Sequence, residues 1–334
     1  MSRKIPKAAL RLAGLLLGLG AFGLAIYSIP GRKLYSAIAI NFNARLVLVI
    51  SLWLLSIVFQ AWRWQVMLYP QKRVGFHQAL KLFIMNRLTN LLLPFRAGEG
   101  VRVVAAKKLW NINVPYVIAT VFNERILNLA FLAIMGFILT FFVPTLQKYQ
   151  GLLLAVVTAI AGMVLWILWN KRRAFEIVAV DNEAVSQHLS NKGRLYKFAY
   201  RFQQGLAVFN SPPVLLGTLL TSLASWLCIW AALTLLAQNV HASQPAACAL
   251  ALILFTHVAS LAHLTPSNVG PFQWGCILAY SFFGVQQADA VGSSLVFQAV
   301  RVVAAGLVGL GVLAGDAVLS LRARAQGVWE TQVE

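Results

Sequence analysis

Long apolar segments recur along this chain, and they restrict its fold more than any other feature. A helix needs about 20 apolar residues to cross the hydrocarbon core of a bilayer. Segments of roughly that length lie at residues 10–29, 46–69, 114–142, 151–169, 214–237 and 291–320. Only 11% of the 334 residues are charged, whereas soluble domains carry about a quarter. The pattern predicts an all-α integral membrane protein, a polytopic helix bundle with one transmembrane domain over residues 1–334.

Two further apolar segments are interrupted by polar residues. Polar or charged side chains are spread along residues 76–94, among them His77, Lys81, Asn86, Arg87 and Asn90. This segment leads into a polar stretch that ends near residue 110, and residues 246–285 are broken by two prolines. Such segments cannot face lipid on all sides, because polar groups in hydrocarbon need partners. We expect an interfacial or re-entrant helix within 76–110, and either two short crossings or one re-entrant hairpin within 246–285. The total is six to eight membrane-spanning helices.

The basic residues predict the orientation. If the N-terminus is inside, the inside segments hold 17 Lys and Arg residues and the outside loops hold four. Cytoplasmic loops carry the excess of Lys and Arg, so we expect both termini and the hydrophilic loop 170–211 inside, with an uncleaved first span. The net charge of +19 is therefore explained by membrane topology, and we expect no nucleic-acid partner.

Ionisable residues also occur at hydrophobic depth, most densely between Asn86 and Arg102. Each unpaired ionisable group there costs roughly 2.5–3.5 kcal/mol, so these groups need partners or a function. They could form a structural ion-pair network. Alternatively, they could line a cavity in which arginines bind phosphate bidentately and a carboxylate balances charge or carries a proton. The candidate cavity residues are Asn90, Arg96, Glu99, Arg102, Asn123, Glu124, Arg125, Asn268, Gln273 and Arg301.

Two helix breaks share a short pattern. The segments 92–98 and 264–270 both read L-x-P-x-x-x-G. Paired broken helices in the two halves of a chain indicate a transporter site. The similarity could reflect an inverted repeat of a first half, 1–169, and a second half, 212–320, or it could arise by chance. The expected break residues are Pro94, Gly98, Pro266, Gly270 and Pro271.

The sequence contains no signature of a soluble enzyme. It has no P-loop, GxSxG, glycine-rich dinucleotide turn or HExxH motif. Cys228, Cys248 and Cys276 are dispersed in apolar segments, which is typical of buried hydrophobic side chains. We expect no metal and no cofactor.

The motifs together resemble a known family. Residues 90–102 read N-L-L-L-P-F-R-A-G-E-G-V-R, and Glu124-Arg125, the 266–270 break and Arg301 follow. This resembles the transmembrane region of lysylphosphatidylglycerol synthases, the lipid-flippase part of the multiple peptide resistance factors, and stand-alone relatives, some associated with hopanoid or glycolipid pathways. The resemblance implies an inner-membrane protein that moves or flips lipids. The soluble aminoacyl-transferring domain is missing, so synthase activity is not implied.

The second break departs from the family pattern. Family members commonly read P-G-G-x-G-x-x-E there, whereas this chain has Ser267, Asn268 and Gln273. The missing carboxylate puts proton coupling at that position in doubt.

Three functions fit the sequence. The first is a non-enzymatic lipid translocase in which arginines recognise a polar or anionic head group. The second is a membrane-embedded transferase with Glu99 or Glu124 as general base. The third is a non-catalytic partner of a lipid-modifying synthase or glycosyltransferase that docks on loop 170–211. The lipid, the direction and energy source of its movement, and the oligomeric state are left open.

Overall fold

The computed structural model describes residues 7–27, 29–92, 97–169, 193–206, 211–260 and 265–325. These residues form twelve α-helices and two short 3-10 helices and contain no strand. The all-α prediction is therefore confirmed for the described part of the chain.

Among the described residues, four helices are long and apolar enough to cross a membrane. They are α3 (Ala44–Leu68), α6 (Val114–Leu139), α11 (Pro212–Asn239) and α14 (Gln287–Ala325). Proline near the N-terminus of α6 and α11 suits the first turn of a helix, and the Asn43 side chain caps α3 by accepting a hydrogen bond from the amide of Arg45. Helices α3 and α11 pack against each other and form the centre of the bundle.

The first broken segment forms a hairpin of two short helices, α4 (Phe76–Leu92) and α5 (Ala97–Trp110). The Nζ atom of Lys72 donates a hydrogen bond of 3.0 Å to the backbone oxygen of Trp110, so the outer ends of the hairpin lie together. Helix α4 has 17 residues, which gives about 25 Å of helix. Helix α5 is shorter still, with 14 residues, so neither helix of the hairpin is long enough to span the roughly 30 Å hydrocarbon core.

The second broken segment is also a hairpin, made of α12 (Pro245–Ala259) and α13 (Pro271–Ser281). The amide of Ser243 donates a hydrogen bond of 3.1 Å to the backbone oxygen of Phe283, which joins its outer ends. The two helices have 15 and 11 residues, which gives about 23 Å and 17 Å of helix, so each is shorter than the roughly 30 Å hydrocarbon core.

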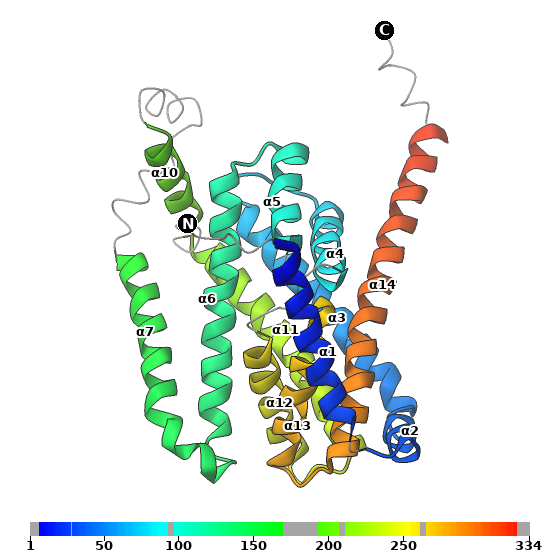
Figure 1. The fold of residues 1–334 in the computed structure, drawn as a ribbon. Coiled ribbons are helices and arrows are strands. Elements are labelled where there is room, and N and C mark those ends of the chain that lie inside the picture. The colour runs from blue at the N-terminus through cyan, green and yellow to red at the C-terminus, as the bar shows by residue number, and fades with distance from the viewer. Residues whose placement is uncertain are drawn as a thin grey trace, which may run out of the picture.

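The two hairpins approach each other from opposite ends of the bundle. The outer ends of α4 and α5 lie at the top of Figure 1, near α10, and the α12–α13 hairpin occupies the lower half. Their tips meet where α4 contacts the 3-10 helix η3 (Pro266–Asn268). Each hairpin also packs against a long helix of the other half, α4 against α14 and α12 against α6. This exchange of partners is the arrangement that an inverted repeat would produce.

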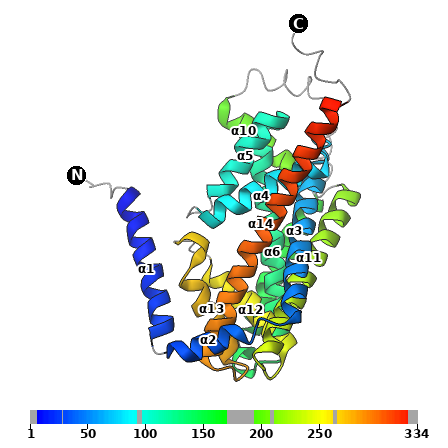
Figure 2. The same cartoon turned by 90° about the vertical axis from the view of Figure 1, so that its right-hand side faces the viewer.

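The remaining helices lie around this core. Helix α1 (Lys7–Tyr27) stands beside α13 and α14 (Figure 2), and α7 (Gln150–Trp169) pairs with α6 after the 3-10 helix η1 (Pro144–Tyr149). Two amphipathic helices, α2 (Gly31–Ala39) and α10 (Arg194–Leu206), lie in segments that the sequence analysis treated as connections. These helices were not predicted because each has too few apolar residues to span a membrane. Their apolar residues do recur at helical spacing in the sequence.

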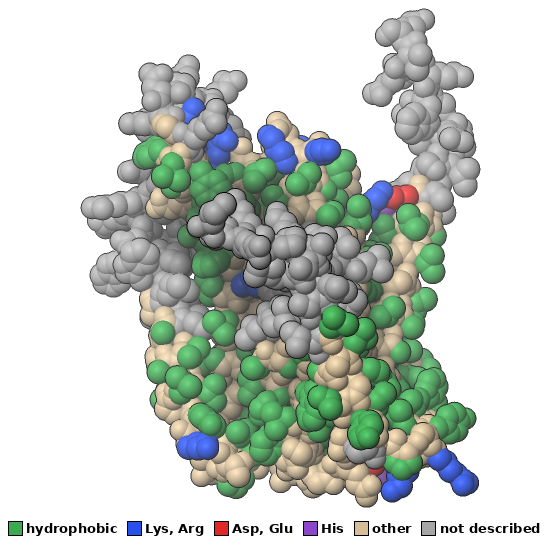
Figure 3. Space-filling view, viewed as in Figure 1, with side chains coloured by type: hydrophobic (Ala, Val, Ile, Leu, Met, Phe, Trp, Pro, Cys, Tyr) green, Lys and Arg blue, Asp and Glu red, His purple; other side chains and the backbone are tan. Residues whose placement is uncertain are grey.

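The surface agrees with placement in a membrane. Figure 3 shows hydrophobic side chains over much of the middle of one face, whereas Lys and Arg side chains gather mainly at its two ends. An apolar band between charged ends is expected of a protein whose middle faces lipid.

Candidate functional site

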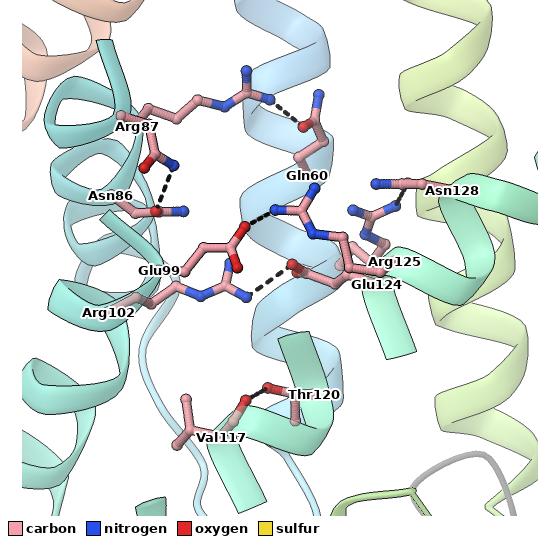
Figure 4. A network of polar contacts seen from close by, with 12 residues as sticks. Gln60, Asn86, Arg87, Glu99, Arg102, Val117, Thr120, Glu124, Arg125 and Asn128 are labelled. Carbon is pink, nitrogen blue, oxygen red and sulfur yellow. Dashed lines mark hydrogen bonds and ion pairs between the residues drawn. The ribbon is translucent and has the colours of Figure 1, made fainter. Parts of the chain in front are cut away.

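A polar network lies where the first hairpin meets α3 and α6. Figure 4 shows side chains from α3, α4, α5 and α6 converging within otherwise apolar surroundings. The helix break between α4 and α5 places the beginning of α5 beside the middle of α6, which brings residues 20 to 30 positions apart into contact.

The deepest contact in this network is the ion pair between Arg102 and Glu124. The Nη2 atom of Arg102 lies 2.8 Å from Oε2 of Glu124, and the two side chains are 2% and 9% exposed. The Arg102 guanidinium also stacks on the ring of Trp64, 4.5 Å from its centroid. The pair is sealed from solvent, although Nε of Arg102 and Oε1 of Glu124 have no hydrogen-bond partner among the described residues. Because it is buried and joins the two helices, we assign it to holding α5 on α6.

A second ion pair, Glu99 with Arg125, lies beside the first and is more open. Its side chains are 26% and 45% exposed. Glu99 and Arg102 are one turn apart on α5, and Glu124 and Arg125 are adjacent on α6, so two ion pairs join the same two helices. Glu99 and Arg102 therefore share the face of α5 that lies against α6.

Arg63 on α3 belongs to the same interior but was missed by the sequence analysis. It is 3% exposed, and its Nη1 atom donates hydrogen bonds to Asn128 at 3.0 Å and to Ser222 at 3.3 Å. The signal was present in the sequence, because Arg63 is the only charged residue of the apolar segment 46–69 and a buried arginine in such a segment needs an explanation.

Arg87 on α4 was also left out of the predicted set, although it lies in the polar stretch. It donates a hydrogen bond to Gln60 of α3, and its guanidinium lies over the ring of Phe83, 5.5 Å from the centroid. The neighbouring Asn90 supports the helix break, because its Oδ1 atom accepts a 2.8 Å hydrogen bond from the amide of Gly98.

The second helix break is also stabilised by hydrogen bonds between uncharged groups. The Oε1 atom of Gln273 accepts a 2.7 Å hydrogen bond from the amide of Gly270, and its Nε2 atom donates one of 2.6 Å to Gln298. Gln298 in turn donates to the backbone oxygen of Ser267 at 3.0 Å. A side-chain amide oxygen thus holds the glycine amide at the start of the second arm in each hairpin.

Arg301 lies one turn after Gln298 on α14. Its guanidinium stacks on Phe272, 5.1 Å from the ring centroid, and in the described part of the chain it has neither a carboxylate partner nor a hydrogen-bond acceptor. Arg301 is also the charged group with the strongest electrostatic effect on Arg87. The two half-buried arginines lie on α4 and α14, two helices from opposite halves of the chain that pack against each other.

Some predicted residues lie elsewhere. Asn123 donates a 2.9 Å hydrogen bond to the backbone oxygen of Gly205 on α10 and so joins α6 to α10. Asn268 donates to Ser260 at 2.7 Å, within the second break. Pro94 and Arg96 lie outside the described residues, whereas Pro266 begins η3 and Pro271 begins α13.

The charges of this interior do not balance. Among the described residues, five arginines and two glutamates contribute to it, and both glutamates already pair with arginine. Like charges in a medium of low dielectric constant repel strongly, so the arrangement suits an anionic ligand. The described residues contain no group of three side chains suited to holding a metal ion.

Comparison with known proteins supports the family resemblance that the sequence motifs indicate. No curated protein and no solved structure matches the chain significantly. One family model does match, over residues 11–309, which is most of the chain. That range contains both hairpins, the two ion pairs and Arg301. The chain therefore belongs to the family of lysylphosphatidylglycerol synthase transmembrane regions.

Proposed function

We propose that this protein translocates a lipid with an anionic head group, as a multi-pass protein of the inner membrane with both termini in the cytoplasm. Its family is a membrane region associated with flippase-like function. The proposed activity is transport, with no bond made or broken in the lipid. The N-inside orientation rests on the distribution of Lys and Arg.

One observation carries this proposal, the surplus of guanidinium groups where the two hairpins meet. Arg87 and Arg301 come from opposite halves of the chain, both are half-buried, and neither has a carboxylate partner in the described structure. A phosphate group accepts several charge-assisted hydrogen bonds from arginine. A lipid phosphate between Arg87 and Arg301 would offset the repulsion between them.

The other charged residues have different roles in this proposal. Arg63 and Arg102 are buried and hydrogen-bonded, so they hold the helices around the site rather than contact lipid. The half-exposed pair of Glu99 and Arg125 is open enough to exchange partners, with Arg125 turning from Glu99 to a passing phosphate. Helix breaks suit such a site, because irregular backbone is tolerated at membrane depth where it lines a polar cavity.

The test is lipid transfer in reconstituted vesicles that contain fluorescent phosphatidylglycerol. Replacing Arg301 or Arg87 by Gln removes charge-assisted hydrogen bonds worth about 1.5–3 kcal/mol, so we expect transfer to fall about tenfold or more. Lys148→Gln is the control, because Lys148 lies on η1, away from the hairpin tips. Transfer at the wild-type rate by both arginine variants would refute the proposal.

A further inference from the structure

The second break contains polar groups but no acid. Gln273, Gln298 and Asn268 are uncharged, and the sequence has no Asp or Glu between Glu183 and Asp289 or between Asp289 and Asp316. No carboxylate of the second half therefore lies in the middle of its membrane segments. Among the described residues, the contacts of Asn268, Gln273, Gln298 and Arg301 at this break involve amides, hydroxyls and one guanidinium group.

In the first half, both carboxylates at membrane depth already have an arginine partner. Glu99 is paired with Arg125, and Glu124 is paired with the buried Arg102. A lipid ammonium group could otherwise bind to an aromatic face, but the Phe272 ring beside the second break already carries the guanidinium of Arg301. An aminoacyl head group with ammonium groups would therefore meet net positive charge and no counter-ion.

The second break does offer a free hydrogen-bond acceptor. Asn268 is 6% exposed, and its buried Oδ1 atom has no hydrogen-bond partner among the described residues. A buried acceptor without a partner is costly, and a hydroxyl group is a neutral donor that would satisfy it. The backbone at Ser267 and Asn268 has positive φ angles of 51° and 61°, which holds this acceptor at the hairpin tip, beside the contact with α4.

We propose that the site selects an anionic lipid whose head group carries hydroxyl groups, as in a glycerol or sugar phosphate, and discriminates against lipids with a cationic aminoacyl head group. This inference rests on the proposed function. The phosphate lies near Arg87 and Arg301, and a head-group hydroxyl donates to Asn268. The neutral second break is the element that sets this preference.

The test compares phosphatidylglycerol with lysyl-phosphatidylglycerol in the same reconstituted vesicles. We expect the wild-type protein to transfer phosphatidylglycerol about tenfold faster, the factor that corresponds to one lost charge-assisted contact. The variant Asn268→Asp adds a carboxylate at the acceptor with little change of shape, and Asp tolerates the left-handed backbone. This variant should shift the ratio of the two rates towards the lysyl lipid.

Gln238→Glu is the matched control, because it adds the same charge at the exposed end of α11, and it should leave the ratio unchanged. Equal or faster transfer of lysyl-phosphatidylglycerol by the wild-type protein would overturn the head-group inference while leaving lipid transfer intact. Failure to transfer either lipid would instead overturn the proposed function. The wild-type ratio alone decides the question if Asn268→Asp does not fold.

Discussion

The Oγ atom of Ser267 donates a 3.1 Å hydrogen bond to the backbone oxygen of Leu91. These residues are 176 positions apart and lie at the tips of two hairpins from opposite halves of the chain. The backbone oxygen of Leu91 is available because α4 ends there, and the last carbonyls of a helix have no partner within it. The contact therefore joins the tips of the two hairpins.

The opposed hairpins make a prediction about accessibility. Leu109 is 64% exposed near the outer end of α5, and Ser243 is exposed near the outer end of α12. A cysteine replacing Leu109 should react with a membrane-impermeant thiol reagent from the cytoplasmic side only, and one replacing Ser243 from the opposite side only. The three natural cysteines are buried, so their background reaction should be low. Labelling of both positions from the same side would rule out opposed hairpins.

The two ion pairs between α5 and α6 should differ in their contribution to stability. Glu124→Gln leaves the buried Arg102 without its counter-ion, and we expect a loss of about 3–5 kcal/mol in the free energy of unfolding. Glu99→Gln breaks a half-exposed pair, whose contribution is screened, and should cost less than about 1 kcal/mol. Unfolding of the purified protein in detergent measures both. Equal losses, or a larger loss for Glu99→Gln, would contradict these roles.

Two glycines of α5 form a matched pair. A Cβ atom at Gly98 would overlap the backbone oxygen of Asn86, whereas one at Gly100 would meet no atom within 4 Å. Gly98→Ala should therefore disrupt the α4–α5 hairpin and lower both stability and transfer. Gly100→Ala should stabilise the helix by up to about 1 kcal/mol. If both variants unfold at the same temperature, the close packing of α5 on α4 at Gly98 is wrong.

Much of this architecture follows from the sequence because its physical signals are local. Four of the predicted spans reappear as long apolar helices, and the breaks near 94 and 266 separate short helices as their proline and glycine residues predict. The contact between the two hairpin tips, at Leu91 and Ser267, was not predicted. Such a contact depends on packing, and no local pattern encodes it.

The site was less predictable for the same reason. The sequence marked Glu99, Arg102, Glu124 and Arg125 as partners, but only the structure shows which arginine binds which glutamate. Arg63 was missed because it stands between two tryptophans that resemble an interfacial belt. Asn123 was expected in the cavity, but it faces α10, whose helix was not predicted.

The central claim is that Arg87 and Arg301 bind the same lipid phosphate, and a double-mutant cycle on phosphatidylglycerol transfer tests it most directly. Groups that act on one ligand give non-additive effects. We predict that Arg87→Gln and Arg301→Gln each slow transfer about tenfold or more. The double variant should lose clearly less than the product of the two single losses. Losses that multiply fully, or single variants that transfer at the wild-type rate, would contradict a shared phosphate site.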